Sequence, residues 1–254
     1  MTERAERDVL ASGPLDGVRP LSATDAVRAR ILLAIELGLL KPGEQLPPHE
    51  STARALNVSL MTLRRVFGTL ADQGILERRR GRGGGTFVSD PIDPRTWQED
   101  GSVRGFRDRT STVIQLIDER ALIESALAAE AAGTVRDGAR ARALDEAAQA
   151  LEDAVAAADW AEFHDADRAF HRAVASASGL DWALAEHSRI ADQLYDYFVP
   201  YPIAYLRDSN DEHRRILAAI EEGDALGAAR TARAHVLELK RSMFIAERPD
   251  GQGR

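Results

Sequence analysis

The sequence predicts a mainly α-helical protein, in which an N-terminal winged helix-turn-helix precedes an all-helical antiparallel bundle of six or seven helices. Three observations predict this fold class. Three helical segments separated by turn residues are followed by two short β-prone runs around a glycine-rich tip. Beyond residue 110 apolar residues recur at helical spacing, and alanine is abundant. The 254 residues are enough for two domains that each bury a core.

The elements of the N-terminal part are predicted from turn residues and helix caps. Ser59 is a favourable N-cap for the third helix, and Gly74 ends that helix. Residues 79–85 combine arginine with glycine and form the flexible, basic tip of a hairpin. The expected elements are helices over residues 26–38, 49–56 and 60–73 and strands over residues 75–78 and 86–88.

The C-terminal part is predicted to be helical throughout, with breaks at glycine and proline. The expected helices cover residues 111–133, 138–158, 159–178, 181–199, 207–222 and 224–247. The expected organisation is a flexible tail over residues 1–22, a winged helix over 23–90, a polar linker over 91–110, the helical domain over 111–247 and a second tail over 248–254. One helical turn around Trp97 is compatible with the linker.

Composition limits the class of protein. The chain has no cysteine, which excludes disulfides, thiolate metal ligands and a cysteine nucleophile. No run approaches the roughly 18 apolar residues that span a bilayer, and the first residues lack the apolar core of a signal peptide. We therefore expect a cytoplasmic protein.

The net charge of −8 is unevenly distributed. Residues 59–89 carry six arginines against two acids, whereas residues 91–254 carry twenty basic against thirty acidic residues. This asymmetry indicates a nucleic-acid-facing module on an acidic body.

The third helix is the predicted recognition helix, because a helix-turn-helix places the N-terminal residues of its second helix in the major groove. Arg64 can bind O6 and N7 of guanine, and Ser59 and Thr62 can bind phosphates. The wing arginines can neutralise phosphates, while glycines allow close approach of the backbone. The expected DNA-contacting residues are His49, Glu50, Ser59, Leu60, Met61, Thr62, Arg64, Arg65, Arg80, Arg82, Gly83 and Gly84.

Two other interpretations of this segment are open. The arginines could form only a solvated charged face, and the glycine cluster could suggest a phosphate-binding loop. The cluster lacks the Lys-Ser/Thr pair and the βαβ context of a P-loop. The order of helices, turn and wing therefore favours DNA binding.

Residues 27–88 resemble the winged-helix domain of the GntR family. The matching segments are residues 38–47, 53–59, 70–76 and 81–88. The resemblance implies dimeric binding to a short palindromic operator. Members of this branch often carry arginine at the positions of Glu50 and Leu60, whereas only Arg64 keeps it here. Glu50 would repel phosphate or accept from a cytosine amino group, and Leu60 could contact a thymine methyl group.

Four polar side chains in the C-terminal part are predicted to point toward the bundle interior. Asp167 lies in the apolar seam of its helix, and His171 follows it at i+4. His213 and His235 lie on the inward sides of two later helices. Buried groups of this kind need compensation, and a zinc, nickel, manganese or iron ion would provide it. Taken singly, each histidine could also be an ordinary core or surface residue.

Arg120 is predicted to point at least partly inward, so it needs an anion. It could bind the carboxylate of an effector, or it could pair with Glu124 at i+4. We expect His164 to be a bystander and His187 to lie on the surface. The further candidates for lining an effector pocket are Tyr195, Tyr197, Tyr201 and Asn210.

Residues from about 111 to 243 resemble the FCD domain, the effector domain of the FadR-like branch of the GntR family. The matching segments are residues 119–124, 167–171, 212–224 and 234–236. Metal-binding members use an aspartate and three histidines at the positions of Asp167, His171, His213 and His235. The resemblance thus implies a bound divalent metal, for which zinc is the first candidate.

These features together predict a ligand-responsive transcription regulator, not an enzyme. We expect a homodimer that binds double-stranded operator DNA as a repressor. A small carboxylate bound beside the metal would release this dimer from the DNA. The carboxylate would be a hydroxy acid or a sugar acid, and activation is the alternative to repression. The competing class is a metal-dependent helical hydrolase of HD type, suggested by His164, Asp165, Asp167 and His171. That class leaves the basic winged helix without a role.

Overall fold

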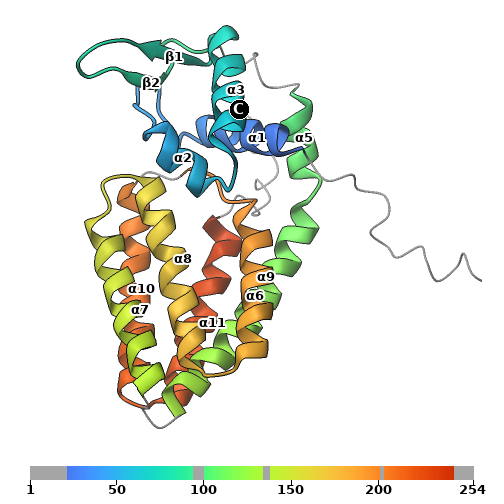
Figure 1. The fold of residues 1–254 in the computed structure, drawn as a ribbon. Helices are drawn as coiled ribbons and strands as arrows, with labels where there is room; N and C mark the ends of the chain where they lie inside the picture. Colours follow the sequence, from blue (N-terminus) through green and yellow to red (C-terminus); the bar gives the residue numbers. More distant parts are fainter. Residues whose placement is uncertain (1–21, 94–99, 134–137, 201–202, 243–254) are drawn as a thin grey trace, which may run out of the picture.

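The computed structural model describes residues 22–93, 100–133, 138–200 and 203–242. A head of three helices and one hairpin lies above a bundle of long helices (Figure 1). This arrangement confirms the predicted fold class. Among the described residues, no helix combines the length and the apolarity that a membrane-spanning segment requires.

The head contains the predicted order of helices and strands. Its elements are α1 (Ala23–Glu36), α2 (His49–Ala55), α3 (Leu60–Asp72), β1 (Leu76–Arg79) and β2 (Gly85–Val88). The Ser59 side chain caps α3 by accepting from the backbone N–H of Thr62 at 3.0 Å. The strands pair antiparallel, with Leu76 opposite Val88, and residues 80–84 form the tip between them.

The bundle contains six helices among the described residues. They are α6 (Thr110–Gly133), α7 (Gly138–Ala156), α8 (Trp160–Ala177), α9 (Asp181–Tyr195), α10 (Ile203–Glu221) and α11 (Ala225–Ser242). The main packed pairs are α6 with α11 and α7 with α8. Most predicted boundaries agree within two residues, but α1 begins three residues earlier than predicted, α9 ends four residues earlier and α10 begins four residues earlier. The predicted end of the last helix, at residue 247, lies outside the described residues.

A further helix, α5 (Gly101–Arg107), occupies part of the segment predicted as a polar linker. The Asp100 side chain caps it by accepting from the backbone N–H of Ser102 at 2.9 Å. Val103 and Phe106, one turn apart, are buried in the core of the head. This helix was not predicted from the sequence, because two apolar residues among many charged ones give only a weak periodic pattern. The turn expected around Trp97 lies outside the described residues.

The head and the bundle meet through a continuous apolar core, to which Trp160 and Val199 of the bundle belong together with buried residues of the head, and α2 packs against α8. Arg30 of α1 is 1% exposed and crosses this junction. Its guanidinium donates to the backbone oxygen of Leu56 in the head at 3.1 Å and to that of Tyr195 at the end of α9 at 3.0 Å. A helix C-terminus favours such a cation.

Candidate metal and ligand site

Three imidazoles from three different helices meet inside the bundle. The Nε2 atom of His235 on α11 lies 3.2 Å from Nε2 of His213 on α10 and 3.3 Å from Nε2 of His171 on α8. All three rings are buried. The structure therefore brings together the three histidines that the sequence placed on inward faces.

Asp167 supplies a fourth donor atom beside the imidazoles. Its Oδ1 lies 3.4 Å from Nε2 of His213 and 3.7 Å from Nε2 of His171. Its Oδ2 accepts from the hydroxyl of Tyr195 at 2.8 Å. Burial alone would raise the pKa of this carboxyl, but His171, His213 and Arg120 lower it below its usual value. Asp167 is thus an anion in the folded protein.

The spacing of these atoms suits one small cation. Four ligand atoms at about 2.0–2.1 Å from a tetrahedral ion lie about 3.3–3.4 Å from one another. The four separations given above, from 3.2 to 3.7 Å, are close to those edges, and the ligand atoms of the three histidines all lie within 4.8 Å of one another. Imidazole and carboxylate donors are ligands of zinc and of other first-row metals.

Two carboxylates hold the outer nitrogens of these rings. Nδ1 of His171 lies 2.9 Å from Glu124 Oε2, and Nδ1 of His235 lies 2.7 Å from Glu212 Oε2. An ionised carboxylate only accepts hydrogen bonds, so we assign the proton of each neutral ring to Nδ1. The Nε2 atoms of His171 and His235 then face each other as lone pairs. A cation between them removes this repulsion, as in carboxylate–histidine–metal sites.

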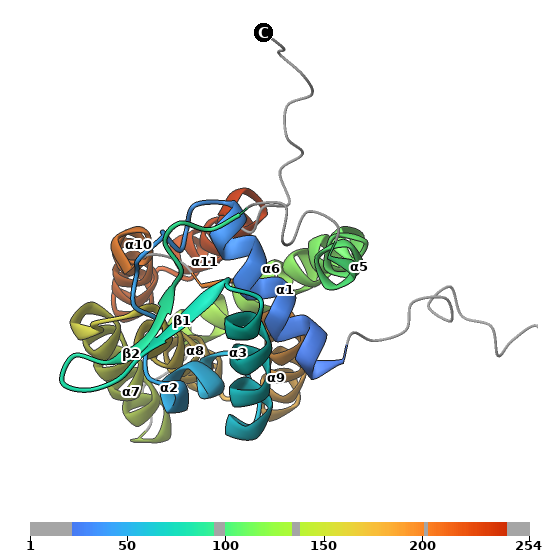
Figure 2. The same ribbon diagram turned by 90° about the horizontal axis from the view of Figure 1, so that it is seen from above.

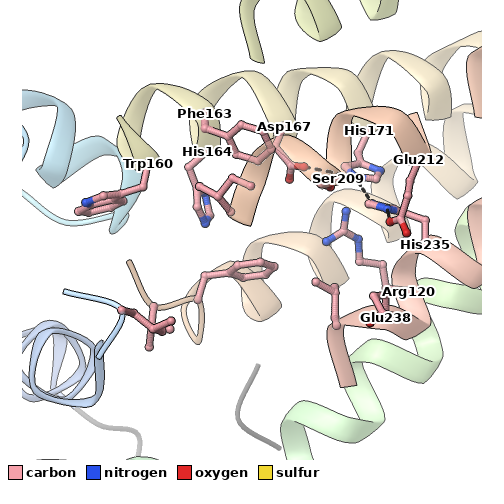
Figure 3. A pocket seen from close by; sticks show the side chains of 15 residues that line it. Arg120, Trp160, Phe163, His164, Asp167, His171, Ser209, Glu212, His235 and Glu238 are labelled. Carbon is pink, nitrogen blue, oxygen red and sulfur yellow. Dashed lines mark hydrogen bonds and ion pairs between the residues drawn. The ribbon is translucent and has the colours of Figure 1, made fainter. Parts of the chain in front are cut away.

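Arg120 pairs with Glu124, as the alternative interpretation predicted. Its Nε donates to Glu124 Oε1 at 2.6 Å, and both side chains are buried. Burial would raise the pKa of Glu124, but Arg120 and His171 hold it well below its usual value. Figure 3 shows the rest of the guanidinium pointing into a cavity, opposite Asp167. Pairing with Glu124 and contact with a ligand are therefore compatible.

Asp167, His171 and His235 line one end of a cavity of about 490 Å³, whereas His213 lies behind them and is not part of its lining. Its lining residues are Leu39, Arg120, Trp160, Phe163, His164, Asp167, His171, Phe198, Val199, Leu206, Ser209, Glu212, His235, Glu238 and Leu239. Apart from His164, the charged and polar groups lie at the end near the imidazoles, and apolar side chains extend toward the head (Figure 3). A cavity of this size and composition is typical of a site for an organic ligand.

Several residues differ from their predicted places. His187 was expected on the surface, but it is only 2% exposed. Its Nε2 lies 3.0 Å from Glu124 Oε1. A buried carboxylate needs more than one hydrogen-bond donor, and His187 supplies one of them. Asn210 is buried without lining the cavity, whereas its neighbour Ser209 lines it. Tyr201 lies outside the described residues. Tyr197 is half-buried near Phe106, away from the cavity lining.

Glu124 and Glu212 are site residues that sequence reasoning did not select as such. The i+4 spacing from Arg120 and the inward phase of its helix could have identified Glu124. Glu212 directly precedes His213, and adjacent helical residues point to different sides. Its partner is His235 on another helix, so periodicity carries no signal for this contact.

The predicted DNA-contacting residues lie on α2, on α3 and in the wing, all within the head (Figures 1 and 2). Met61 is 82% exposed, and Arg65, Arg80, Arg82 and Gly83 are also exposed. The guanidinium of Arg64 is exposed and lies 3.6 Å from Glu50.

Two of the predicted DNA-contacting groups are already engaged inside the head. His49 is half-buried, and its Nε2 lies 2.9 Å from the hydroxyl of Thr86. The Ser59 hydroxyl caps α3 and lies 2.9 Å from that of Thr62. Leu60 and Gly84 are half-buried.

Fold and site together define a winged-helix protein with a helical ligand-binding domain, and comparisons with known proteins identify its family. Residues 23–88 match the family described as bacterial regulatory proteins, gntR family, and residues 115–238 match the FCD domain. The chain belongs to the GntR family and carries an FCD domain of the FadR-like branch, which confirms both predicted resemblances. These families comprise transcription regulators, which favours the predicted class over the hydrolase.

Among curated relatives, the putative HTH-type transcriptional regulator RmpR of Mycobacterium gastri is 45% identical over 76 residues, or 30% of this chain and 28% of that protein. The putative L-lactate dehydrogenase operon regulatory protein of Escherichia coli is 32% identical over 119 residues, or 45% of each chain. The chain thus spans less than half the length of the curated relatives it matches.

Two solved structures align with most of the chain. Streptococcus agalactiae GntR is 26% identical, with 86% of this chain and 99% of that chain covered and a TM-score of 0.44. E. coli McbR/YncC is 17% identical, with 89% and 98% covered and a TM-score of 0.45.

Proposed function

We propose that this protein is a ligand-responsive, DNA-binding transcription regulator that senses a carboxylate beside a divalent metal. Asp167, His171, His213 and His235 would hold the metal. The observation that carries the proposal is the convergence of the buried imidazoles of His171, His213 and His235. Carboxylates orient two of these rings, since Glu124 contacts His171 and Glu212 contacts His235. When bound, the metal would act as a Lewis acid for an oxygen of the ligand.

The charges around the cavity make the metal necessary for an anionic ligand. Four carboxyl groups, from Glu124, Asp167, Glu212 and Glu238, surround or line this end of the cavity, against the one guanidinium of Arg120. Without a cation this excess of negative charge repels a carboxylate. With the metal in place, Arg120 supplies hydrogen bonds to the carboxylate.

The exposed residues of α3 and the wing support DNA binding. We expect Arg64, Met61 and Leu60 to contact base edges, and Arg80 and Arg82 to neutralise phosphates near Gly83 and Gly84. A homodimer would place two copies of α3 in successive major grooves of a palindromic operator and repress transcription. The ligand would act by binding the DNA-competent and DNA-incompetent states with different affinity.

Metal removal tests this function. We expect the zinc-loaded protein to bind DNA from the region upstream of its own gene. Its affinity for this DNA should change when a carboxylate is added. L-lactate is the first hydroxy acid to test, because one relative is named as a putative L-lactate dehydrogenase operon regulatory protein. Fluorescence anisotropy with labelled DNA measures both steps. After chelation the carboxylate response should disappear, since the negatively charged cavity repels the acid.

Paired variants complete this test. His171→Ala and His235→Ala should lose metal and carboxylate response together, whereas Leu226→Ala, at a residue 73% exposed, should keep both. If the two histidine variants retain metal content and ligand response, the proposed site is wrong. Turnover of a phosphodiester by the zinc-loaded protein would instead support the hydrolase.

A further inference from the structure

The cavity continues well beyond the proposed metal site. One stripe of α8 forms its wall, because Trp160, His164, Asp167 and His171 recur at spacings of three or four residues. This stripe runs from the head into the bundle (Figures 1 and 3). A small hydroxy acid at the metal end would leave the rest of the cavity without an occupant.

The far half of the cavity is apolar and includes a residue of the head. Phe163, Phe198, Val199 and Leu206 line it, and Leu39 closes it from the segment that follows α1. Apolar walls of this kind favour hydrocarbon over the hydroxyl groups of a sugar acid, because each unpaired hydroxyl loses hydrogen bonds to water.

Two polar groups interrupt this apolar half, and both are without partners. The two ring nitrogens of His164 and the indole Nε1 of Trp160 are buried and have no hydrogen-bond partner among the described residues. Figure 3 shows the His164 ring pointing from α8 into the cavity. Buried polar groups are nearly always satisfied, so the His164 ring, which lines the cavity, indicates a hydrogen-bonding group of a ligand.

The environment of His164 restricts the charge of that ligand group. Burial lowers the pKa of His164 to about 3, so the ring is neutral at physiological pH. A neutral imidazole suits an uncharged oxygen, such as a hydroxyl or a carbonyl.

We propose that the ligand is an extended carboxylic acid with an apolar middle and an uncharged oxygen at its far end. This proposal rests on the proposed function, because the carboxylate lies at the metal and Arg120. The oxygen would bind the imidazole of His164, whose two ring nitrogens have no other partner among the described residues. The two polar ends of the stripe are about seven residues apart, or roughly 10 Å along the helix. An extended chain advances about 1.2 Å per bond, so the acid has about seven to nine carbons.

A ligand series on the full-length, zinc-loaded protein tests the proposal by isothermal titration calorimetry. The probes are L-lactate, butanoate, octanoate and 8-hydroxyoctanoate. We expect affinity to rise about fourfold for each buried methylene group between butanoate and octanoate. The terminal hydroxyl of 8-hydroxyoctanoate should add about tenfold more, as one satisfied hydrogen bond.

Variants assign these effects to the cavity. His164→Phe should abolish the preference for 8-hydroxyoctanoate over octanoate while octanoate still binds, and His164→Gln should restore part of it. Leu206→Gln should weaken octanoate binding, whereas Leu226→Gln, at an exposed position outside the cavity lining, should not. Thermal unfolding checks that each variant is folded.

The outcomes separate this inference from the proposed function. If L-lactate binds and changes DNA affinity while octanoate and 8-hydroxyoctanoate bind no more tightly than butanoate, the extended ligand is wrong and the metal–carboxylate site stands. Equal hydroxyl preference in His164→Phe and the unmodified protein would also overturn the inference. If none of the four acids binds the zinc-loaded protein, both proposals fail.

Discussion

At the scale of single residues, Glu124 connects the groups around the proposed metal site. Its Oε1 accepts from Arg120 and lies 3.0 Å from Nε2 of His187, and its Oε2 lies 2.9 Å from Nδ1 of His171. It therefore neutralises a buried cation and holds a proposed metal ligand in one tautomer. A single buried carboxylate serves both purposes.

Glu124→Gln should affect stability and metal binding together. The variant leaves the buried guanidinium of Arg120 without its anion, which costs about 3–5 kcal/mol of unfolding free energy. It also weakens the acceptor on His171, so zinc affinity should fall about 10–100-fold. Urea denaturation and competitive zinc titration measure the two effects. Glu146→Gln, at an exposed position on α7, is the control, and unchanged zinc affinity in Glu124→Gln would contradict this role.

At the scale of elements, α3 depends on its cap as well as on its buried face. Leu63, Val66, Phe67 and Leu70 bury that face, and Ser59 satisfies the backbone N–H of Thr62. Ser59→Ala should lower the unfolding free energy by about 1 kcal/mol. It should also weaken DNA binding, since the first turn of α3 carries the proposed base contacts. Ser59→Asp should restore stability but not DNA affinity, because a carboxylate caps the helix and repels phosphate.

Elements with a strong local pattern could be predicted from the sequence, and elements that depend on a distant surface could not. The segments of α3, β1 and β2 carry capping, apolar and turn signals within the segment itself. In α5, Val103 and Phe106 become informative only once α1 provides a surface for them. The same limit applies to the site, where helical periodicity predicted the inward phase of His171 and His213. The contacts of Glu212 and His187 depend on helix packing, which periodicity does not determine.

At the scale of the whole molecule, direct contacts join the proposed metal site to the head. Asp167 accepts from the hydroxyl of Tyr195, and the backbone oxygen of Tyr195 accepts from Arg30. Arg30 also donates to the backbone oxygen of Leu56, just before the turn that leads into α3. Burial lowers the pKa of Arg30 to about 9, which leaves the guanidinium protonated at neutral pH. A shift at Asp167 can therefore move the base of the recognition helix through two side chains.

Arg30→Gln tests whether this path carries the ligand response. Contiguity alone does not establish coupling, so the measured quantity must be the factor by which ligand changes DNA affinity. Hydrogen bonds from a buried charged donor contribute about 1.5–3 kcal/mol, so this factor should shrink about tenfold or more. Anisotropy titrations of the zinc-loaded protein, with whichever of L-lactate and 8-hydroxyoctanoate binds, measure it.

The control for this test is Arg28→Gln on the same helix. Arg28 pairs with Asp100 at 2.7 Å, next to α5, and does not contact α9 in the described interactions. Its loss should lower stability without changing the ligand response. Zinc affinity should stay the same in both variants, because neither residue touches the four donor residues. If Arg30→Gln is folded and keeps the full response, the ligand must act on the head by another route, of which direct contact with Leu39 in the cavity wall is the nearest.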